Sequence, residues 1–196
     1  MWFIPKLVFL LFAYWLTTCA NAQNQHIDRL AKELRDDDSE IRRQAATSLG
    51  RASFPQSVKL LHRAFIEEQQ VEIRLEIIKA LRQIVFQRFP GYRDALQVIG
   101  FASDGFNEVN ELVRLRASEA LWEAAKKDLL NPVPFLERNL NDPNERLRLS
   151  AIQMLRKLGT VNTIKPLGKA ATDMTQSEKI RLEAIEALGA ISISDA

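Results

Sequence analysis

Several residue types are scarce in this chain of 196 residues, and each scarcity excludes a class of protein. A single cysteine excludes a fold held together by intramolecular disulfides. Seven glycines and seven prolines are too few for a low-complexity linker or a collagen-like chain. The 27 basic and 25 acidic side chains leave a net charge of only +2, which argues against binding to nucleic acid.

Side chains suited to catalysis or metal binding are also scarce. The two histidines, His26 and His62, are isolated from each other in the sequence. No glycine-rich phosphate-binding loop occurs, and no histidine is paired with a glutamate as in a metal site. We therefore expect no catalytic residue, no cofactor and no metal, and we predict that the chain is not an enzyme.

The first 22 residues have the pattern of a secretory signal peptide. Lys6 precedes an apolar run, and a small-x-small motif ends at Ala22. The run is shorter than the roughly 20 apolar residues that span a membrane. We predict that residues 1–22 are removed and that residues 23–196 form a periplasmic domain without a membrane span.

Cys19 leaves other locations open. The segment Leu16-Thr17-Thr18-Cys19 resembles a bacterial lipobox, in which the modified cysteine becomes a lipidated N-terminus. This resemblance implies an envelope protein anchored to the membrane by lipid, and secretion from the cell is a further alternative.

The remainder of the chain contains a repeat that occurs five times. Leucines recur at spacings of 32, 40, 34 and 33 residues, with an arginine seven residues before each. Apolar residues four and eight positions before each leucine indicate an amphipathic helix. The leucines are Leu49, Leu81, Leu121, Leu155 and Leu188. The arginines are Arg42, Arg74, Arg114, Arg148 and Arg181.

A shorter apolar pattern precedes each of these helices, so each repeat is predicted to be a helical hairpin. No segment shows the alternation of a strand. The sequence therefore predicts an all-α fold, an α-solenoid of about five hairpins. The predicted repeats span about residues 27–52, 55–87, 91–126, 132–158 and 163–191.

The repeat pattern resembles the HEAT repeats, particularly the short HEAT-like kind that also occurs in phycobilin lyases. Residues 38–42 with Leu49-Gly50, and Ile180-Arg181 with Leu188-Gly189, carry the resemblance, which covers residues 27–191. It implies a scaffold or adaptor that binds another protein through a concave surface. The phycobilin lyases imply an alternative, a lyase-type enzyme or its accessory subunit.

The repeat arginines share the apolar face of their helices, so we expect them to lie between helices. A buried charge costs several kcal/mol unless it is paired, and the turns inside the hairpins supply carboxylates. These are Asp36, Asp37, Asp38, Glu67, Glu68, Asp104, Glu108, Asp142 and Asp173. We predict that the five arginines hold neighbouring repeats together; an anion-binding stripe is the alternative.

The opposite face of the second helices is polar and is predicted to bind the partner. Its residues are Glu76, Lys79, Arg116, Glu119, Gln153, Glu183 and Glu186. We expect the pairs 76/116 and 79/119 to oppose each other, and a merely solvated face is the alternative. Phe106, in a polar loop of the longer third repeat, is predicted to anchor the partner.

The expected partner is another envelope protein, and the chain alone is expected to be a monomer. Near its end, Ile191 and Ile193 are predicted to cover the last repeat's stacking face or to dock a partner.

Overall fold

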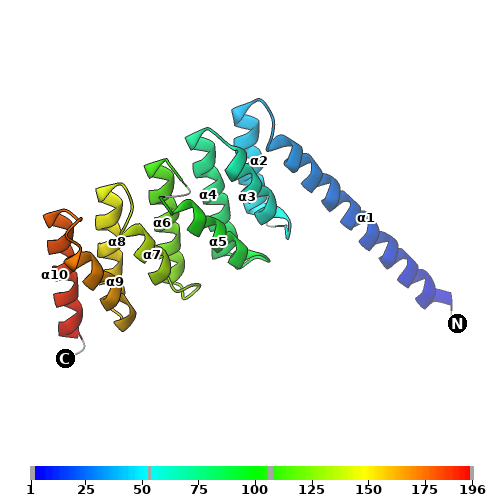
Figure 1. Cartoon of the computed structure of the whole chain (residues 1–196). Helices are drawn as coiled ribbons and strands as arrows, with labels where there is room; N and C mark the ends of the chain where they lie inside the picture. Colours follow the sequence, from blue (N-terminus) through cyan, green and yellow to red (C-terminus); the bar gives the residue numbers. More distant parts are fainter. Residues whose placement is uncertain (1–2, 53, 106–107, 195–196) are drawn as a thin grey trace. The chain divides into compact units, whose positions relative to one another are not determined.

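The computed structural model describes residues 3–52, 54–105 and 108–194, and every regular element in these ranges is an α-helix (Figure 1). The all-α class predicted from the sequence is confirmed. The chain divides into two compact units, residues 1–80 and 81–196, with one helix continuing across the boundary.

Unit 1 begins with a single long helix. Its elements are α1 (Phe3–Glu33), α2 (Ser39–Ala52), α3 (Ser57–Glu67) and most of α4 (Val71–Phe86). Helix α1 has 31 residues and crosses the predicted cleavage point after Ala22 without a break. Residues 20–25 are exposed, whereas Ile27 and Leu30 are buried, so the final turns of α1 pack into the repeat. Among the described residues, no helix is both long and apolar enough to cross a membrane.

Unit 2 consists of three further hairpins after the end of α4. Its helices are α5 (Tyr92–Ala102), α6 (Glu111–Ala125), α7 (Val133–Asn139), α8 (Glu145–Leu158), α9 (Val161–Thr172) and α10 (Glu178–Ser194). The second helices α6, α8 and α10 lie side by side in Figure 1, as their mutual contacts require.

Local side-chain chemistry sets the helix ends. Asn110 and Asn144 precede α6 and α8, and their side-chain oxygens accept hydrogen bonds from the first free backbone N–H groups. At the opposite ends, Arg88, Asp128 and Gly159 adopt left-handed conformations with φ of 51°, 55° and 56°. These residues reverse the chain direction after α4, α6 and α8, which frees it to begin the next hairpin.

The repeat pattern becomes a continuous core within unit 2. Apolar side chains from both faces of each hairpin meet there, because one hairpin cannot bury its own apolar stripe. The buried members are Leu136, Leu140, Ala151, Ile152, Leu155, Leu167, Ala170, Ile180, Ala184, Ala187 and Ile191. Ile191, predicted to cover the last repeat, therefore belongs to this core, while the side chain of Ile193 is outside the described part.

Candidate functional site

Arg114 forms a deeply buried ion pair with Asp142. Its Nε donates to Oδ2 of Asp142 at 2.7 Å and its Nη2 donates to Oδ1 at 2.9 Å. The two side chains are 5% and 1% exposed. Because Arg114 begins α6 and Asp142 precedes α8, this two-pronged contact fixes the third repeat to the fourth.

Arg42 makes the same contact in unit 1. Its Nε donates to Glu68 at 2.7 Å, joining the first repeat to the second. This bond raises the pKa of the Arg42 guanidinium above its ordinary value. Burial pushes the pKa of the Glu68 carboxyl up, but bonds from Arg42 and from the backbone of Gln69 and Gln70 outweigh it. The net pKa of Glu68 lies below its ordinary value, so the carboxyl stays ionised.

A second contact explains how a cation is tolerated at a helix N-terminus, where the helix dipole opposes it. Nη1 of Arg42 donates to the carbonyls of Asp36 and Asp37, and Nη1 of Arg114 donates to those of Glu108 and Val109. Each guanidinium thus bonds to the carbonyls of its own hairpin turn while it binds the carboxylate in the turn of the next repeat. With their donors taken by the protein, Arg42 and Arg114 offer little to an external anion.

We call the repeat arginines and the carboxylates that they bind in the next repeat the ladder. The ladder carboxylate has a fixed position in the repeat. Glu68 and Asp142, which bind Arg42 and Arg114, each stand six residues before the arginine of their own repeat, and Asp36 and Glu108 occupy the same sequence position. In the fifth repeat this position holds Thr175, so Arg148 meets no carboxylate there. Arg148 still donates to the carbonyls of Asp142 and Pro143, but its buried Nε has no hydrogen-bond partner among the described residues.

Two of the carboxylates proposed for the ladder bind elsewhere. Asp104 pairs with Arg138 on α7 at 3.8 Å. Asp173 accepts hydrogen bonds from the backbone and hydroxyl of Thr175. Turn position alone therefore does not identify a ladder carboxylate, because only the residue six before the arginine projects between repeats.

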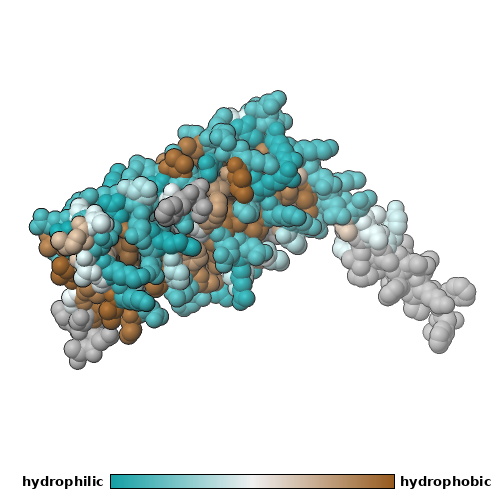
Figure 2. All heavy atoms as spheres, viewed as in Figure 1, coloured by the Kyte–Doolittle hydropathy of each residue, from teal (hydrophilic) through white to brown (hydrophobic). Residues whose placement is uncertain are grey.

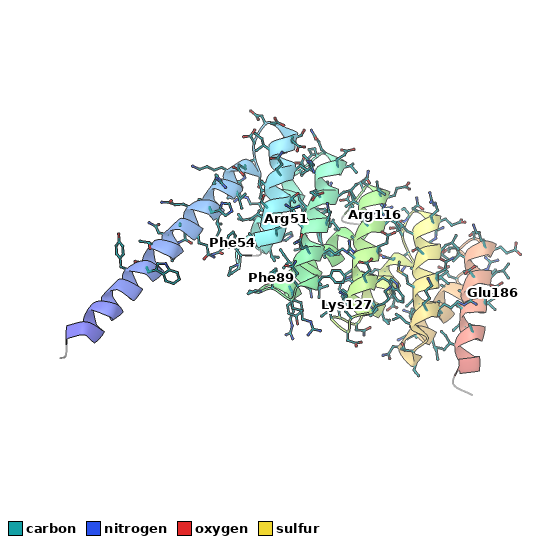
Figure 3. The ribbon with its side chains drawn as sticks, turned by 180° about the vertical axis from the view of Figure 1, so that it is seen from behind. Arg51, Phe54, Phe89, Arg116, Lys127 and Glu186 are labelled. Carbon is teal, nitrogen blue, oxygen red and sulfur yellow. The ribbon has the colours of Figure 1, made fainter. Side chains whose placement is uncertain are left out.

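The polar residues predicted to bind a partner pair mainly within their own helices. Lys79 contacts Glu76 at 3.2 Å on α4, and Glu76 also accepts from Thr47. Arg116 contacts Glu119 at 2.8 Å on α6. Arg116 and Glu186 project from α6 and α10 in Figure 3. Three further residues of the predicted binding face have no ion pair of this kind: Gln153 and Glu186 are exposed, and Glu183 is half-buried. Phe106 lies outside the described residues.

A groove between α6 and α8 adjoins these rows. It encloses a cavity of about 310 Å³. Its lining residues are Glu111, Leu112, Leu115, Asn144, Arg146, Leu147 and Ser150. Leu112, in the first turn of α6, is 41% exposed. The Asn144 amide donates to the Glu111 carboxylate across one end of the groove, which leaves a leucine floor bordered by polar groups.

This leucine floor was missed by sequence reasoning. Leu112 and Leu115 lie nine and six residues before the reference leucine, outside the stripe used to define the core. An apolar residue on the predicted polar face was the available signal.

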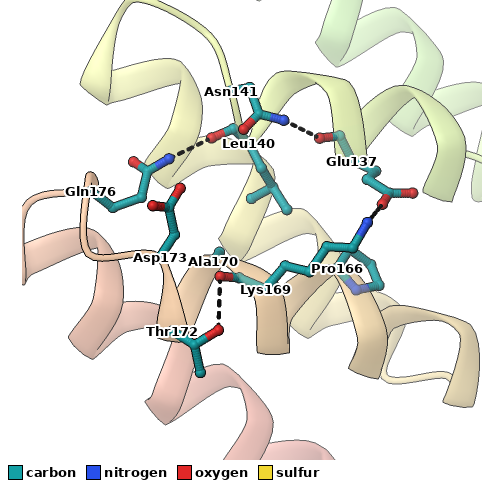
Figure 4. A pocket seen from close by; sticks show the side chains of 9 residues that line it. All are labelled: Glu137, Leu140, Asn141, Pro166, Lys169, Ala170, Thr172, Asp173 and Gln176. Carbon is teal, nitrogen blue, oxygen red and sulfur yellow. Dashed lines mark hydrogen bonds and ion pairs between the residues drawn. The ribbon is translucent and has the colours of Figure 1, made fainter.

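A second hollow, of about 370 Å³, lies between α7 and α9 and is lined mainly by polar groups (Figure 4). Lys169 contacts Glu137 at 2.8 Å, and Gln176 donates to the carbonyl of Leu140 at 3.4 Å. Its polar groups thus already bond to one another. Across the described ranges, no three histidine, cysteine or acidic side chains are grouped in a way that could hold a metal.

The comparison with protein families decides what the stacked hairpins are. A family model for HEAT repeats matches residues 27–100 and 103–189. The chain belongs to the HEAT-repeat family. The ladder and the groove are therefore features of a HEAT solenoid, a scaffold architecture that commonly mediates protein binding.

Three solved structures with similar folds are designed or engineered proteins. One is a computationally designed armadillo repeat protein for modular peptide recognition, with 18% identity, a TM-score of 0.45, and coverage of 82% of this chain and 80% of that chain. Two engineered proteins have 18% and 20% identity and TM-scores of 0.46 and 0.44. They cover 84% and 87% of this chain, and the chain spans 80% and 49% of their lengths. No curated protein matches the chain significantly.

Proposed function

We propose that this HEAT-repeat protein is a non-catalytic scaffold that holds a partner polypeptide on its second-helix face, with the groove between α6 and α8 as the anchor. The observation that carries this proposal is the exposed leucine floor beside a polar row. Burying an apolar side chain of a partner on Leu112 and Leu115 provides binding energy, while the surrounding polar groups orient the bound chain.

The chemistry of the groove restricts the partner segment. Its floor is apolar, and the borders carry charges of opposite sign, Glu111 and Arg146. We expect a segment with an aliphatic or aromatic residue flanked by polar residues of both signs. A strongly acidic or strongly basic segment would meet repulsion at one border.

Location in the bacterial envelope completes the proposal. The signal-peptide pattern supports export, with a soluble periplasmic domain favoured over lipid attachment through Cys19. Intact-mass measurement of the protein from its native host distinguishes these forms. A mass matching residues 23–196 supports simple cleavage, whereas a lipidated chain that begins at Cys19 supports anchoring.

Position-specific crosslinking in intact cells tests the groove. A photoreactive residue at position 112 is expected to give one discrete adduct, and Leu115→Asp in the same chain is expected to abolish it. A photoreactive residue at Lys157, exposed near the end of α8, is the matched control. Equal labelling at both positions, or an adduct unaffected by Leu115→Asp, would contradict the proposal.

A further inference from the structure

In both units, a second helix receives the following repeat on one face. Arg114 binds Asp142 of the next repeat, and four residues later Ser118 accepts from Asn139 at 2.7 Å. At the corresponding end of α2, a Cβ added to Gly50 would lie 2.7 Å from an atom of the next repeat. The positions seven and three before the reference leucine, and the one after it, therefore form the trailing face of a repeat.

The trailing face of the fifth repeat is open. Its three positions are Arg181, Ile185 and Gly189. Ile185 is 53% exposed, whereas Ala46, Ile78, Ser118 and Ile152 at the same position in earlier repeats are at most 2% exposed. The neighbouring Leu182 is 51% exposed, and nothing lies within 4 Å of where a Cβ on Gly189 would be. Figure 2 shows this hydrophobic surface in brown on the part formed by α9 and α10.

Arg181 retains the donors of a ladder arginine. Its Nη1 donates to the carbonyl of Gln176 at 2.9 Å, as the other arginines do in their own turns. In Arg114 the remaining donors, Nε and Nη2, bind the carboxylate of the next repeat. The charge of Arg181 acts on the Asp173 carboxylate of its own turn, but within the described chain no carboxylate of a following repeat faces its Nε and Nη2. The open face thus offers an apolar patch next to a guanidinium that is oriented but incompletely bonded.

We call one arginine–carboxylate contact between repeats a rung. The first repeat presents the carboxylate half of such a contact. Asp36 stands at the ladder-carboxylate position, and its Oδ1 already accepts from the backbone N–H of Asp38, as Asp142 accepts from that of Asn144. No earlier repeat of the chain supplies a repeat arginine to this carboxylate. Ile41, eight before the reference leucine, is 36% exposed, while Ile73, Val113, Leu147 and Ile180 at the same position are at most 4% exposed.

We propose that two copies of this chain associate head to tail, with the fifth repeat of one copy receiving the first repeat of the next. Arg181 of one copy and Asp36 of the other complete a rung like Arg114–Asp142, and Leu182 and Ile185 cover Ile41. Charge complementarity selects a second copy over an unrelated apolar partner, because the carboxylate has the same turn chemistry as the two rungs inside the chain. This association replaces the monomer expected from the sequence and is independent of the groove.

Sedimentation velocity of the full chain over a range of concentrations tests the proposal. The mass-average mass should rise with concentration, and Arg181→Glu or Asp36→Arg should each raise the dissociation constant at least about thirtyfold. The double variant carries the reversed pair and should recover most of the affinity. Arg93→Glu makes the same charge change at an exposed site on α5, a first helix, and should leave association unchanged.

Two further measurements keep the test decisive. Thermal melts establish that each variant is folded, and Ile185→Asp removes apolar contact without touching the ladder residues. A chain that remains monomeric at every concentration overturns the proposal. Association that survives both charge reversals, or that is not recovered in the double variant, assigns it to another surface, such as the apolar segment of residues 1–22, and also overturns it.

Discussion

At the scale of single residues, the ladder shows how a chain without a disulfide joins its repeats. An arginine on an apolar helix face would be costly alone, yet Arg114 satisfies two carbonyls of its own turn and one carboxylate of the next. The carboxylate in turn accepts the backbone N–H of Asn144, which begins the following helix. One side chain therefore links two turns and the start of two helices.

Arg114 and Arg148 are paired differently, so replacing each by alanine should change the free energy of unfolding by a different amount. Arg114→Ala leaves the nearly inaccessible Asp142 carboxylate without its cation, so we expect it to lower the free energy of unfolding by about 3–5 kcal/mol. Arg148→Ala removes two carbonyl hydrogen bonds and a 3.9 Å contact with the exposed Glu145, and should cost about 1 kcal/mol. Chemical denaturation measures both. Arg116→Ala, an exposed arginine on α6, is the control, and equal losses for Arg114 and Arg148 would refute the assigned pairing.

Glu68 should make the stability of unit 1 depend on pH. Because its pKa is lower in the folded chain than the ordinary 4.5, it contributes stability above about pH 4.5 that is lost as the pH falls through the folded pKa. Glu68→Gln should therefore lower the melting temperature at neutral pH, and the difference from the parent should shrink in acid. Glu72→Gln, at an exposed site on α4, should show no such convergence. Glu40, whose pKa is about 2, is present in the parent and in both variants, so its titration does not contribute to the difference between them.

The arginines could be located from the sequence because an arginine occurs at the same position of an otherwise apolar stripe in all five repeats. Their carboxylates could be placed only in the right turns. Asp104 and Asp142 both follow a first helix, yet Asp142 binds Arg114 and Asp104 binds Arg138, and the spacing of six residues to the following arginine identifies the ladder carboxylate only once these contacts are known. The leucines of the groove were missed for a related reason, since an apolar residue on a polar face has no periodicity.

At the scale of elements, one close contact sets the packing of α5 against α7. Gly100 lies under the ring of Phe135, where an added Cβ would come within 2.2 Å of a ring carbon. Arg138, one turn further along α7, stacks on the same ring at 5.1 Å and also reaches Asp104 after α5. A glycine in mid-helix costs helix stability, and here it allows an aromatic ring to fill the space between repeats.

Gly100→Ala should therefore destabilise unit 2 by about 1–3 kcal/mol, because the ring must move from a packed position. Phe135→Leu removes the clash, so the double variant should lose less than the sum of the single losses. Gly168→Ala on α9 is the matched control, since nothing lies within 4 Å of its added Cβ. That change should be neutral or stabilising by up to about 1 kcal/mol. Calorimetric melting separates the cases, and additive losses would contradict the contact.

The hairpins themselves were predictable because their apolar stripe and capping residues agree with each other. The exception is α1, where the sequence indicated a short helix from Ile27 and the structure has one helix from Phe3 to Glu33. A signal-peptide core and a repeat helix are both apolar and helix-forming, and the intervening segment contains no glycine or proline to end the helix. Sequence periodicity therefore marks where α1 begins to pack, not where it begins.

At the scale of the whole molecule, a solenoid's stability is the sum of its repeats and of the interfaces between neighbours. The fifth repeat lacks both the carboxylate at position 175 and a described neighbour on its trailing face. We therefore expect α9 and α10 to exchange backbone amide hydrogens faster than α5 to α8 in hydrogen-exchange mass spectrometry. Slower or equal exchange in the last hairpin would show that the missing rung is compensated elsewhere.

Thr175→Asp should repair the ladder. Thr175 lies three residues after α9 and three before α10, as Asp142 does between α7 and α8, so a carboxylate there should reach the unpartnered Nε of Arg148. A charge-assisted hydrogen bond outweighs the lost bond from the Thr175 hydroxyl to Asp173, for a net gain of about 1 kcal/mol and slower exchange in α9 and α10. Thr175→Asn tests whether charge is needed. In an Arg148→Ala background the gain should disappear, and a gain that persisted there would mean that the new carboxylate binds something other than the ladder.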